Sequence, residues 1–272
     1  MTTTTASTHR PGVTPAHRTD PLAGAVAAEW TRLWSVRSTW WTVLAGVLLM
    51  AASAGQLAIY VANGNTDDDP LNDAGVVAVT DVVIDAVGLT QYAVLALGLL
   101  AITGEFTTGT IRTTLQCTPS RGRVLLAKAL VTGAVTVVLG LLLGAVGVLV
   151  AAPVLGRWGT APAAGTAGDV VAVAVYLALV GVFALGLAAV LRSAVLTLTV
   201  LFATLYIVPL SLREPDIAVL DRIADAFPGE AGRHFLTGDT GPYPAAVGLL
   251  LLAGWAAAAL LAGRAALRRR DA

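Results

Sequence analysis

The sequence LLAITGEFTTGTIRTTLQCTPSRGRVLLAK, residues 99–128, contains the end of one long apolar segment and the start of the next. Between them lies a polar stretch that includes Glu105 and Arg112, followed by the basic residues Arg121 and Arg123. A short polar connection between two long apolar segments is typical of a loop at the surface of a membrane. The stretch therefore predicts a membrane protein with a structured loop after one of its spans.

The composition of the whole chain agrees with this prediction. Of its 272 residues, 56% are hydrophobic and only 12% are charged, whereas about a quarter of the residues of a soluble domain are charged. Six apolar segments contain no Asp, Glu, Lys or Arg, and each is close to the ~20 residues that cross a bilayer as a helix. The expected fold is an all-α polytopic membrane protein with spans at about 41–61, 86–103, 129–153, 170–191, 194–212 and 245–263.

The basic residues predict the orientation of these spans. If the N-terminus is cytoplasmic, the inner segments hold 13 of the 17 Lys and Arg residues and the outer loops hold 4. Cytoplasmic loops carry an excess of Lys and Arg. We therefore expect both termini in the cytoplasm.

The region before the first span has two parts. Residues 1–20 are rich in Thr, Pro, Ser and His and are expected to form a disordered cytoplasmic tail. Residues 21–40 place apolar side chains at helical spacing and predict an amphipathic helix in the plane of the membrane, or else an extension of the first span. Interfacial anchoring is expected from the indole side chains of Trp30, Trp34, Trp40 and Trp41. The six-span domain would then cover 41–267, with a basic tail at 268–272.

Three further features concern the spans and the outer loops. Gly140 and Gly144 form a small-xxx-small pair, which indicates close helix contact or only the general tolerance of membrane helices for glycine. In the outer segment, the pattern predicts a helix over 215–227 that is stopped at Pro228. Asp81 and Asp85 form a carboxylate pair at the outer end of the second span and are expected to be interfacial rather than a proton relay.

The loop after the second span is expected to contain a short helix. Gly104 is expected to end the span, and residues 105–117 can then form about three helical turns before Pro119. One face of this cytoplasmic helix carries Glu105, Gly109, Arg112 and Gln116. Alternatively, the segment is an interfacial loop whose charges only satisfy the excess of positive charge on the inner side.

No motif for an enzyme or for an internal energy source is present. The chain has no G-x-x-x-x-G-K-[ST] phosphate-binding loop, no H-E-x-x-H and no G-x-S-x-G. A single cysteine excludes an intrachain disulfide, and the three histidines are scattered. We therefore expect a protein that is not an enzyme and that binds no cofactor or metal.

Several of these segments resemble a known family. The run from Ile102 to Arg112 and the later Pro-x-Arg and Ala-Lys pairs, ending at Lys128, are similar to the first cytoplasmic loop of ABC-2-type transporter permeases, especially actinobacterial ones. Residues 29–41 resemble the in-plane N-terminal helix of that family, and residues 228–232 resemble its outer loop before the last span.

The resemblance implies an export-type permease subunit in a bacterial plasma membrane. The helix at 105–117 would be the coupling helix, which docks on a separate ATP-binding subunit through Glu105, Gly109, Arg112 and Gln116. ATP and Mg²⁺ would be bound by that subunit, and a second permease copy, identical or different, would complete the transporter. The lipid bilayer is a further expected partner, and nucleic acid is not.

The cargo is expected to be hydrophobic or amphipathic, because the spans offer few polar groups. The candidate polar contacts are the hydroxyls of Thr90, Thr197, Thr199, Thr204 and Tyr206. Two other classes of function stay open. An ion-coupled secondary transporter needs ionisable groups inside the membrane, and a membrane assembly or anchor protein would only bind partners through its loops.

Overall fold

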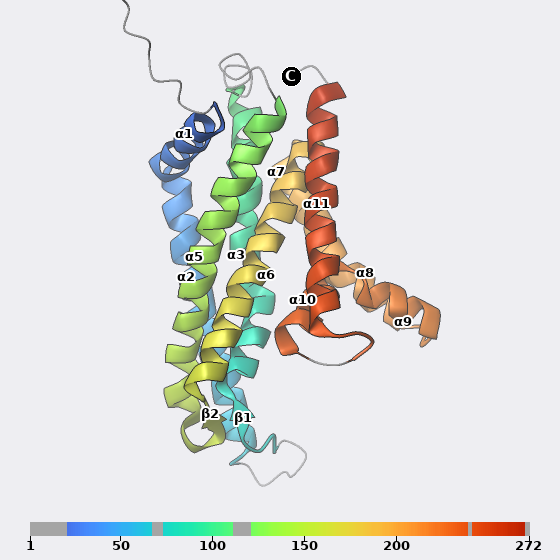
Figure 1. The fold of residues 1–272 in the computed structure, drawn as a ribbon. Helices are drawn as coiled ribbons and strands as arrows, with labels where there is room; N and C mark the ends of the chain where they lie inside the picture. Colours follow the sequence, from blue (N-terminus) through green and yellow to red (C-terminus); the bar gives the residue numbers. More distant parts are fainter. Residues whose placement is uncertain (1–20, 67–72, 111–120, 239–240, 270–272) are drawn as a thin grey trace, which may run out of the picture.

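The computed structural model describes residues 21–66, 73–110, 121–238 and 241–269. Almost all of these residues are helical, and the long helices lie side by side in one bundle (Figure 1). Within the described residues, six helices or continuous helical runs are long and apolar enough to cross a membrane. The predicted all-α polytopic fold is therefore confirmed.

The spans are longer than their apolar segments. They are α2 (Arg37–Gly64), α3 (Val79–Thr108), α5 (Arg121–Leu155), α6 (Ala163–Leu191), the run of α7 (Ala194–Phe202), η2 (Ala203–Ile207) and α8 (Val208–Arg213), and α11 (Ala245–Arg269). Each predicted segment lies inside one of them. A helix can continue where its side chains reach water, so the lack of charges marks the part in lipid and not the end of the helix.

The N-terminal amphipathic helix is shorter than predicted. Helix α1 (Pro21–Ser35) ends at a bend at Val36, and α2 continues from there in another direction (Figure 1). The Thr39 hydroxyl donates a hydrogen bond of 2.7 Å to the carbonyl oxygen of Leu33 across this bend. The predicted single helix over 21–40 is thus wrong at its end, and residues 1–20 lie outside the described residues.

Helices α3 and α6 form the centre of the bundle. Helix α3 packs against α2, α5 and α6, and α6 also packs against α5 and α11. Helices α3 and α6 meet so closely that a Cβ at Gly98 would overlap the carbonyl oxygen of Gly181. Gly140 of α5 makes a similar contact, since a Cβ there would lie 2.6 Å from Cα of Ala174 on α6. The predicted small-residue pair at Gly140 and Gly144 therefore serves packing within the chain.

The two ends of the bundle differ in their contents. One end, which we term the α1 end, carries α1, the end of α3, the start of α5 and the end of α11 (Figure 1). The other end, termed the β end, carries a short pair of parallel strands, β1 (Val77–Ala78) and β2 (Gly159–Thr160). The short helix η1 (Gly156–Trp158) comes directly before β2. Asp81 and Asp85 are exposed on the first turns of α3 at this end.

Two short helices follow the fifth span. Helix α9 (Ala218–Asp225) is followed by α10 (Pro228–Thr237), so Pro228 starts a helix instead of only stopping one. The fixed φ of proline suits the first turn of a helix, where no amide donor is needed. Gly232 of α10 lies against the ring of Tyr176, near the middle of α6. Helix α10 thus lies beside the bundle rather than beyond its end (Figure 1).

Candidate functional site

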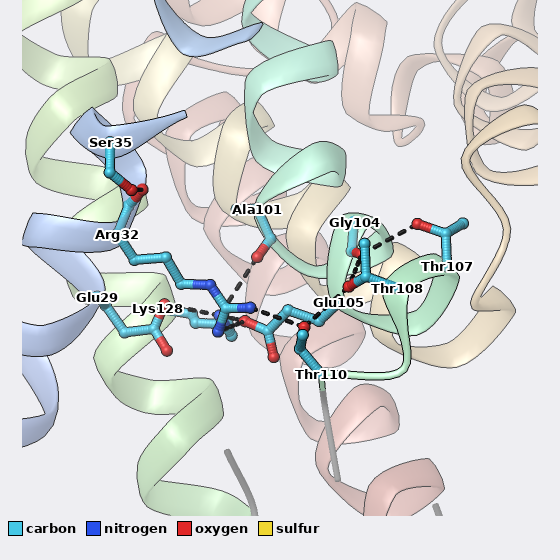
Figure 2. Close-up of polar contacts among 10 residues, drawn as sticks. All are labelled: Glu29, Arg32, Ser35, Ala101, Gly104, Glu105, Thr107, Thr108, Thr110 and Lys128. Carbon is cyan, nitrogen blue, oxygen red and sulfur yellow. Dashed lines mark hydrogen bonds and ion pairs between the residues drawn. The ribbon is translucent and has the colours of Figure 1, made fainter. Parts of the chain in front are cut away.

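Four charged side chains meet at the α1 end, next to both ends of the segment 111–120 (Figure 2). Glu29 and Arg32 belong to α1, Glu105 to the last turn of α3, and Lys128 to the first part of α5. We term these four residues the charge cluster. The cluster joins three helices that are far apart in the sequence.

Lys128 is the centre of the cluster. Its Nζ lies 2.6 Å from Oε2 of Glu29, pairs with Oε1 of Glu105, and donates a hydrogen bond of 3.3 Å to the carbonyl oxygen of Ala101. An ammonium group has three donors, and each of them has an acceptor here. The Lys128 side chain is only 1% exposed. Its charge is therefore compensated entirely inside the protein.

Glu105 receives a second cation through the same oxygen. Nη1 of Arg32 lies 2.7 Å from Oε1 of Glu105, and the Arg32 side chain is 36% exposed. The other carboxylate oxygen, Oε2, is buried and accepts no hydrogen bond from the described residues. In Figure 2 this oxygen points away from the contacts drawn as dashed lines. The two cations and two anions give the cluster no net charge.

Burial makes the cluster sensitive to the loss of any one member. Moving a charge out of water costs several kcal/mol, which the paired charges offset only when the geometry is good. Removing one member of a buried pair leaves the other uncompensated and costs about 3–5 kcal/mol. The ends of α3 and α5 are thus fixed to each other and to α1.

A chain of hydroxyl groups extends this connection toward the segment 111–120. Thr108 donates to the carbonyl oxygen of Gly104 at 2.8 Å, and its hydroxyl lies 2.9 Å from that of Thr110. Nη2 of Arg32 donates to the Thr110 hydroxyl at 3.0 Å (Figure 2). Helix α1 therefore holds the last described residue before that segment.

The predicted contact residues lie in different environments. Helix α3 continues through Gly104 to Thr108, so the predicted break at Gly104 is wrong. Glu105, expected on an exposed face, is 3% exposed and is bound within the chain. Gly109 caps α3 with a φ of 71°, in the left-handed region that favours glycine. Arg112 and Gln116 lie outside the described residues. Docking through Gly109, Arg112 and Gln116 stays a prediction.

Glu29, Arg32 and Lys128 are the members of the charge cluster that were not among the predicted contact residues, and Lys128 carries the clearest signal in the sequence. In the sequence Lys128 counts among the basic residues of the inner segments, which indicate orientation. The structure buries it between α1, α3 and α5. The signal was present in its neighbours, because the single charge stands between apolar residues on both sides, in VLLAKALV. A lone charge within such a run is expected to face a partner inside the protein.

The four tryptophans surround the bend between α1 and α2. Trp30 and Trp34 lie on α1, with ring centroids 5.8 Å apart, and Trp34 contacts Trp40 at 5.0 Å. Trp30, Trp40 and Trp41 are 48%, 59% and 69% exposed, while Trp34 packs against the core. Exposed indoles next to a span are typical of the membrane interface. Their anchoring role stays a prediction.

A cavity of about 390 Å³ lies beside the charge cluster. Its walls come from α1, α2, α3 and α5, and they include all four members of the cluster. The apolar part of the lining consists of Leu33, Val36, Leu97, Leu100, Ala101 and Val131. Hydroxyl groups come from Ser38, Thr39, Thr42, Thr108, Thr110 and Thr132. The volume is within the range of small-molecule sites.

A second polar group connects α8, α9 and α10. Nη2 of Arg213 lies 2.7 Å from Oδ1 of Asp225 and 3.0 Å from Oε2 of Glu230. The Tyr243 hydroxyl donates to the carbonyl oxygen of Asp225, and the ring of His234 lies against that of Tyr243. In the described part of the chain, no three His, Cys, Asp or Glu side chains are placed to hold a metal ion. These contacts fasten α9 and α10 to the bundle.

The comparison with protein families identifies the fold. The family model described as "ABC-2 family transporter protein" matches residues 34–215, well over half of the chain. The chain belongs to the ABC-2 transporter family. The match covers Glu105 and Lys128 and the first five spans of this ABC-2 permease, but not Glu29 and Arg32 of α1. No curated protein matches the chain.

Membership in the ABC-2 family favours a transporter component among the classes of function that the sequence left open. The chain is the membrane component of an ABC transporter, from a permease family that lacks a nucleotide-binding domain. Permeases of this family generally work with an ATP-binding subunit. The charge cluster therefore lies at the end of an ABC-2 permease where α3 ends and α5 begins, on either side of the segment 111–120.

Proposed function

We propose that this chain is the transmembrane subunit of an ATP-driven exporter and that the segment from Gly109 to Cys117 receives work from a separate ATP-binding subunit. The observation that carries the proposal is the Glu105–Lys128 ion pair, which joins the helices on both sides of that segment. A push on the segment would then reach α3 and α5 together. Arg32 and Glu29 would pass the same displacement to α1.

The orientation proposed is that of the sequence prediction, with both termini in the cytoplasm of a bacterial cell. The distribution of charges supports it. Arg37, Arg123, Arg264 and Arg268 lie near the α1 end, whereas Asp81 and Asp85 lie near the β end. In this proposed orientation, the end of α3 and the start of α5 face the side where ATP and Mg²⁺ would be bound by the partner subunit.

The proposed cargo is hydrophobic or amphipathic and would pass between two permease copies. Among the hydroxyls considered as polar contacts, Thr90 and Thr197 are fully buried and donate to carbonyl oxygens of their own helices. Thr199 and Tyr206 of the fifth span are exposed. Thr204 donates to the carbonyl oxygen of Val200. Thr199 and Tyr206 are therefore better candidates for contact with cargo than Thr90 and Thr197.

The ion-coupled alternative needs ionisable groups inside the membrane, and the structure offers one candidate pair, the buried residues Glu105 and Lys128. Their mutual compensation argues against it. A carboxylate that carries protons in turn must lose and regain its charge, whereas Glu105 is held by two cations. A requirement for ATP hydrolysis distinguishes the two functions.

The test is co-expression with a candidate ATP-binding subunit encoded beside this chain. Wild type and the double variant Arg112→Ala/Gln116→Ala are purified, and the amount of co-purified subunit and its ATPase activity are measured. We expect the double variant to lose most of the bound subunit while its unfolding temperature stays that of wild type. Arg157→Ala, a matched change at the β end, should bind the subunit normally.

The outcome that contradicts the proposal is normal capture and normal ATPase stimulation by the double variant. Transport that persists without ATP hydrolysis would favour the ion-coupled alternative. Capture of the subunit without any vectorial transport of amphipathic test compounds would favour a membrane assembly protein.

A further inference from the structure

We propose that the cavity beside the charge cluster binds a zwitterionic phospholipid whose headgroup ends in a primary ammonium group. The site lies between α1, α2, α3 and α5 within one chain. The inference does not depend on the proposed ATP-driven function. It rests on the charges, the apolar walls and the position of the cavity.

The charges on the cavity wall match a zwitterion. Two cations and two anions line it, so a ligand with a single charge would add an uncompensated charge in a partly buried place. Arg32 is the more exposed of the two cations and is suited to a phosphate group. Lys128 already uses all three donors within the protein and is unsuited to that role.

Glu29 is suited to the ammonium group. Its carboxylate meets Lys128 through Oε2, and its side chain is 13% exposed. No hydrogen bond of the described residues uses Oε1, which points away from Lys128 in Figure 2. An N–H donor is needed to use this oxygen. A quaternary choline group has no such donor and prefers an aromatic cage, whereas none of the described residues that line the cavity is aromatic.

The apolar walls and the location fit the rest of a lipid. Leu33, Leu97 and Val131 form the inner wall, and Val36 and Leu100 are 46% and 39% exposed at the rim. A glycerol group and the upper part of an acyl chain can pack against them. The exposed indoles of Trp30 on α1 and Trp40 on α2 are typical of the depth where lipid headgroups lie.

The experiment measures lipid retention by native mass spectrometry. The purified full chain is exchanged into detergent with equal amounts of phosphatidylethanolamine, phosphatidylglycerol and phosphatidylcholine of identical acyl chains. We expect phosphatidylethanolamine to be retained about tenfold more than the other two, since the difference is one charge-assisted hydrogen bond or one uncompensated charge.

Two variants test whether phosphatidylethanolamine is retained in the cavity. Thr42→Trp places a large side chain in the cavity and removes only a hydrogen bond to the carbonyl oxygen of Ser38 in the same helix. It should lower the retention of phosphatidylethanolamine to that of the other lipids. Leu48→Trp lies on the same helix at a position that is 59% exposed and does not line the cavity, and it should retain the lipid as wild type does.

Three results would overturn the inference. Equal retention of the three lipids would mean only general contact with the bilayer. Preferred retention of phosphatidylglycerol would assign an anionic ligand. If dodecylamine displaces phosphatidylethanolamine at a similar concentration of free ligand, the cavity is a site for amphipathic amines rather than for a phospholipid.

Discussion

Lys128 of α5 and Glu105 of α3 form an ion pair beside the segment 111–120, with side chains that are 1% and 3% exposed. They stand 23 residues apart in the sequence. Each therefore depends on the other for the compensation of its charge. Glu29 and Arg32 of α1 complete the cluster.

The first prediction concerns the cost of breaking this pair. Lys128→Met should lower the free energy of unfolding by about 3–5 kcal/mol, because Glu29 then loses its ion pair and Glu105 keeps only Arg32. Lys128→Met/Glu105→Gln removes one charge of each sign and should recover part of this loss. Chemical unfolding in detergent micelles measures both. A double variant no more stable than the single one would show that the charges are not coupled.

The second prediction concerns the close contact of α3 and α6. Gly98→Ala should destabilise the protein by about 1–3 kcal/mol, because its Cβ overlaps the carbonyl oxygen of Gly181. Gly88→Ala on the same helix meets nothing within 4 Å and should stabilise slightly, as alanine does within helices. Unfolding temperatures of the two variants give the comparison. Equal shifts would mean that the two helices separate at no cost.

The third prediction concerns the short helices after the fifth span. Arg213→Ala removes the contacts to Asp225 and Glu230 and should speed amide hydrogen exchange in α9 and α10. Arg222→Ala changes an exposed arginine of α9 and should leave exchange there near the wild-type rate. Mass spectrometry of peptides from 218–237 reports both. Identical exchange in the two variants would deny Arg213 a role in holding these helices.

The fourth prediction concerns alkaline pH. Burial, with the nearby Asp225 and Glu230 carboxylates, raises the pKa of Tyr243 to about 12 from its ordinary value of 10.0. The neutral phenol is thus favoured in the folded state. Its contribution to stability is complete below about pH 10 and is lost as the pH rises toward 12. Wild type should therefore lose more stability than Tyr243→Phe over this interval, as measured by unfolding at each pH. Parallel profiles would contradict the assignment.

The spans were predictable because the requirement for apolar length is local. Each apolar segment is sufficient to specify one helix, whatever its neighbours do. The ends were not predictable in the same way. Gly104 and Pro228 looked like helix ends, yet α3 passes through the first and α10 begins at the second. Just beyond Gly104, Glu105 is held by ion pairs from other helices, and at Pro228 the fixed φ of proline suits the first turn of a helix.

Only part of the candidate site could be predicted from the sequence, because its contacts join residues that are far apart in the chain. The helical wheel placed Glu105 correctly as a polar residue near the end of a span, but it could not supply the partners. Lys128 Nζ meets Glu29, which lies 99 residues away in the sequence, and that contact exists only after α1 folds back on the bundle. A helical wheel shows one helix alone, so it assigns a charged residue to the exposed face. The long-range contacts with Arg32 and Lys128 bury Glu105 instead.

The neutrality of the charge cluster has an electrical consequence. Moving one elementary charge through the membrane potential changes the energy by about 2.3 kcal/mol per 100 mV. Glu29, Arg32, Glu105 and Lys128 together carry no net charge. When the four members of the charge cluster move as one unit, their opposite charges cross the field together and the work on them cancels. The cluster itself should therefore add nothing to the voltage dependence of a motion at this junction, and the rates in polarised and depolarised membranes should differ only through other charges such as Arg123.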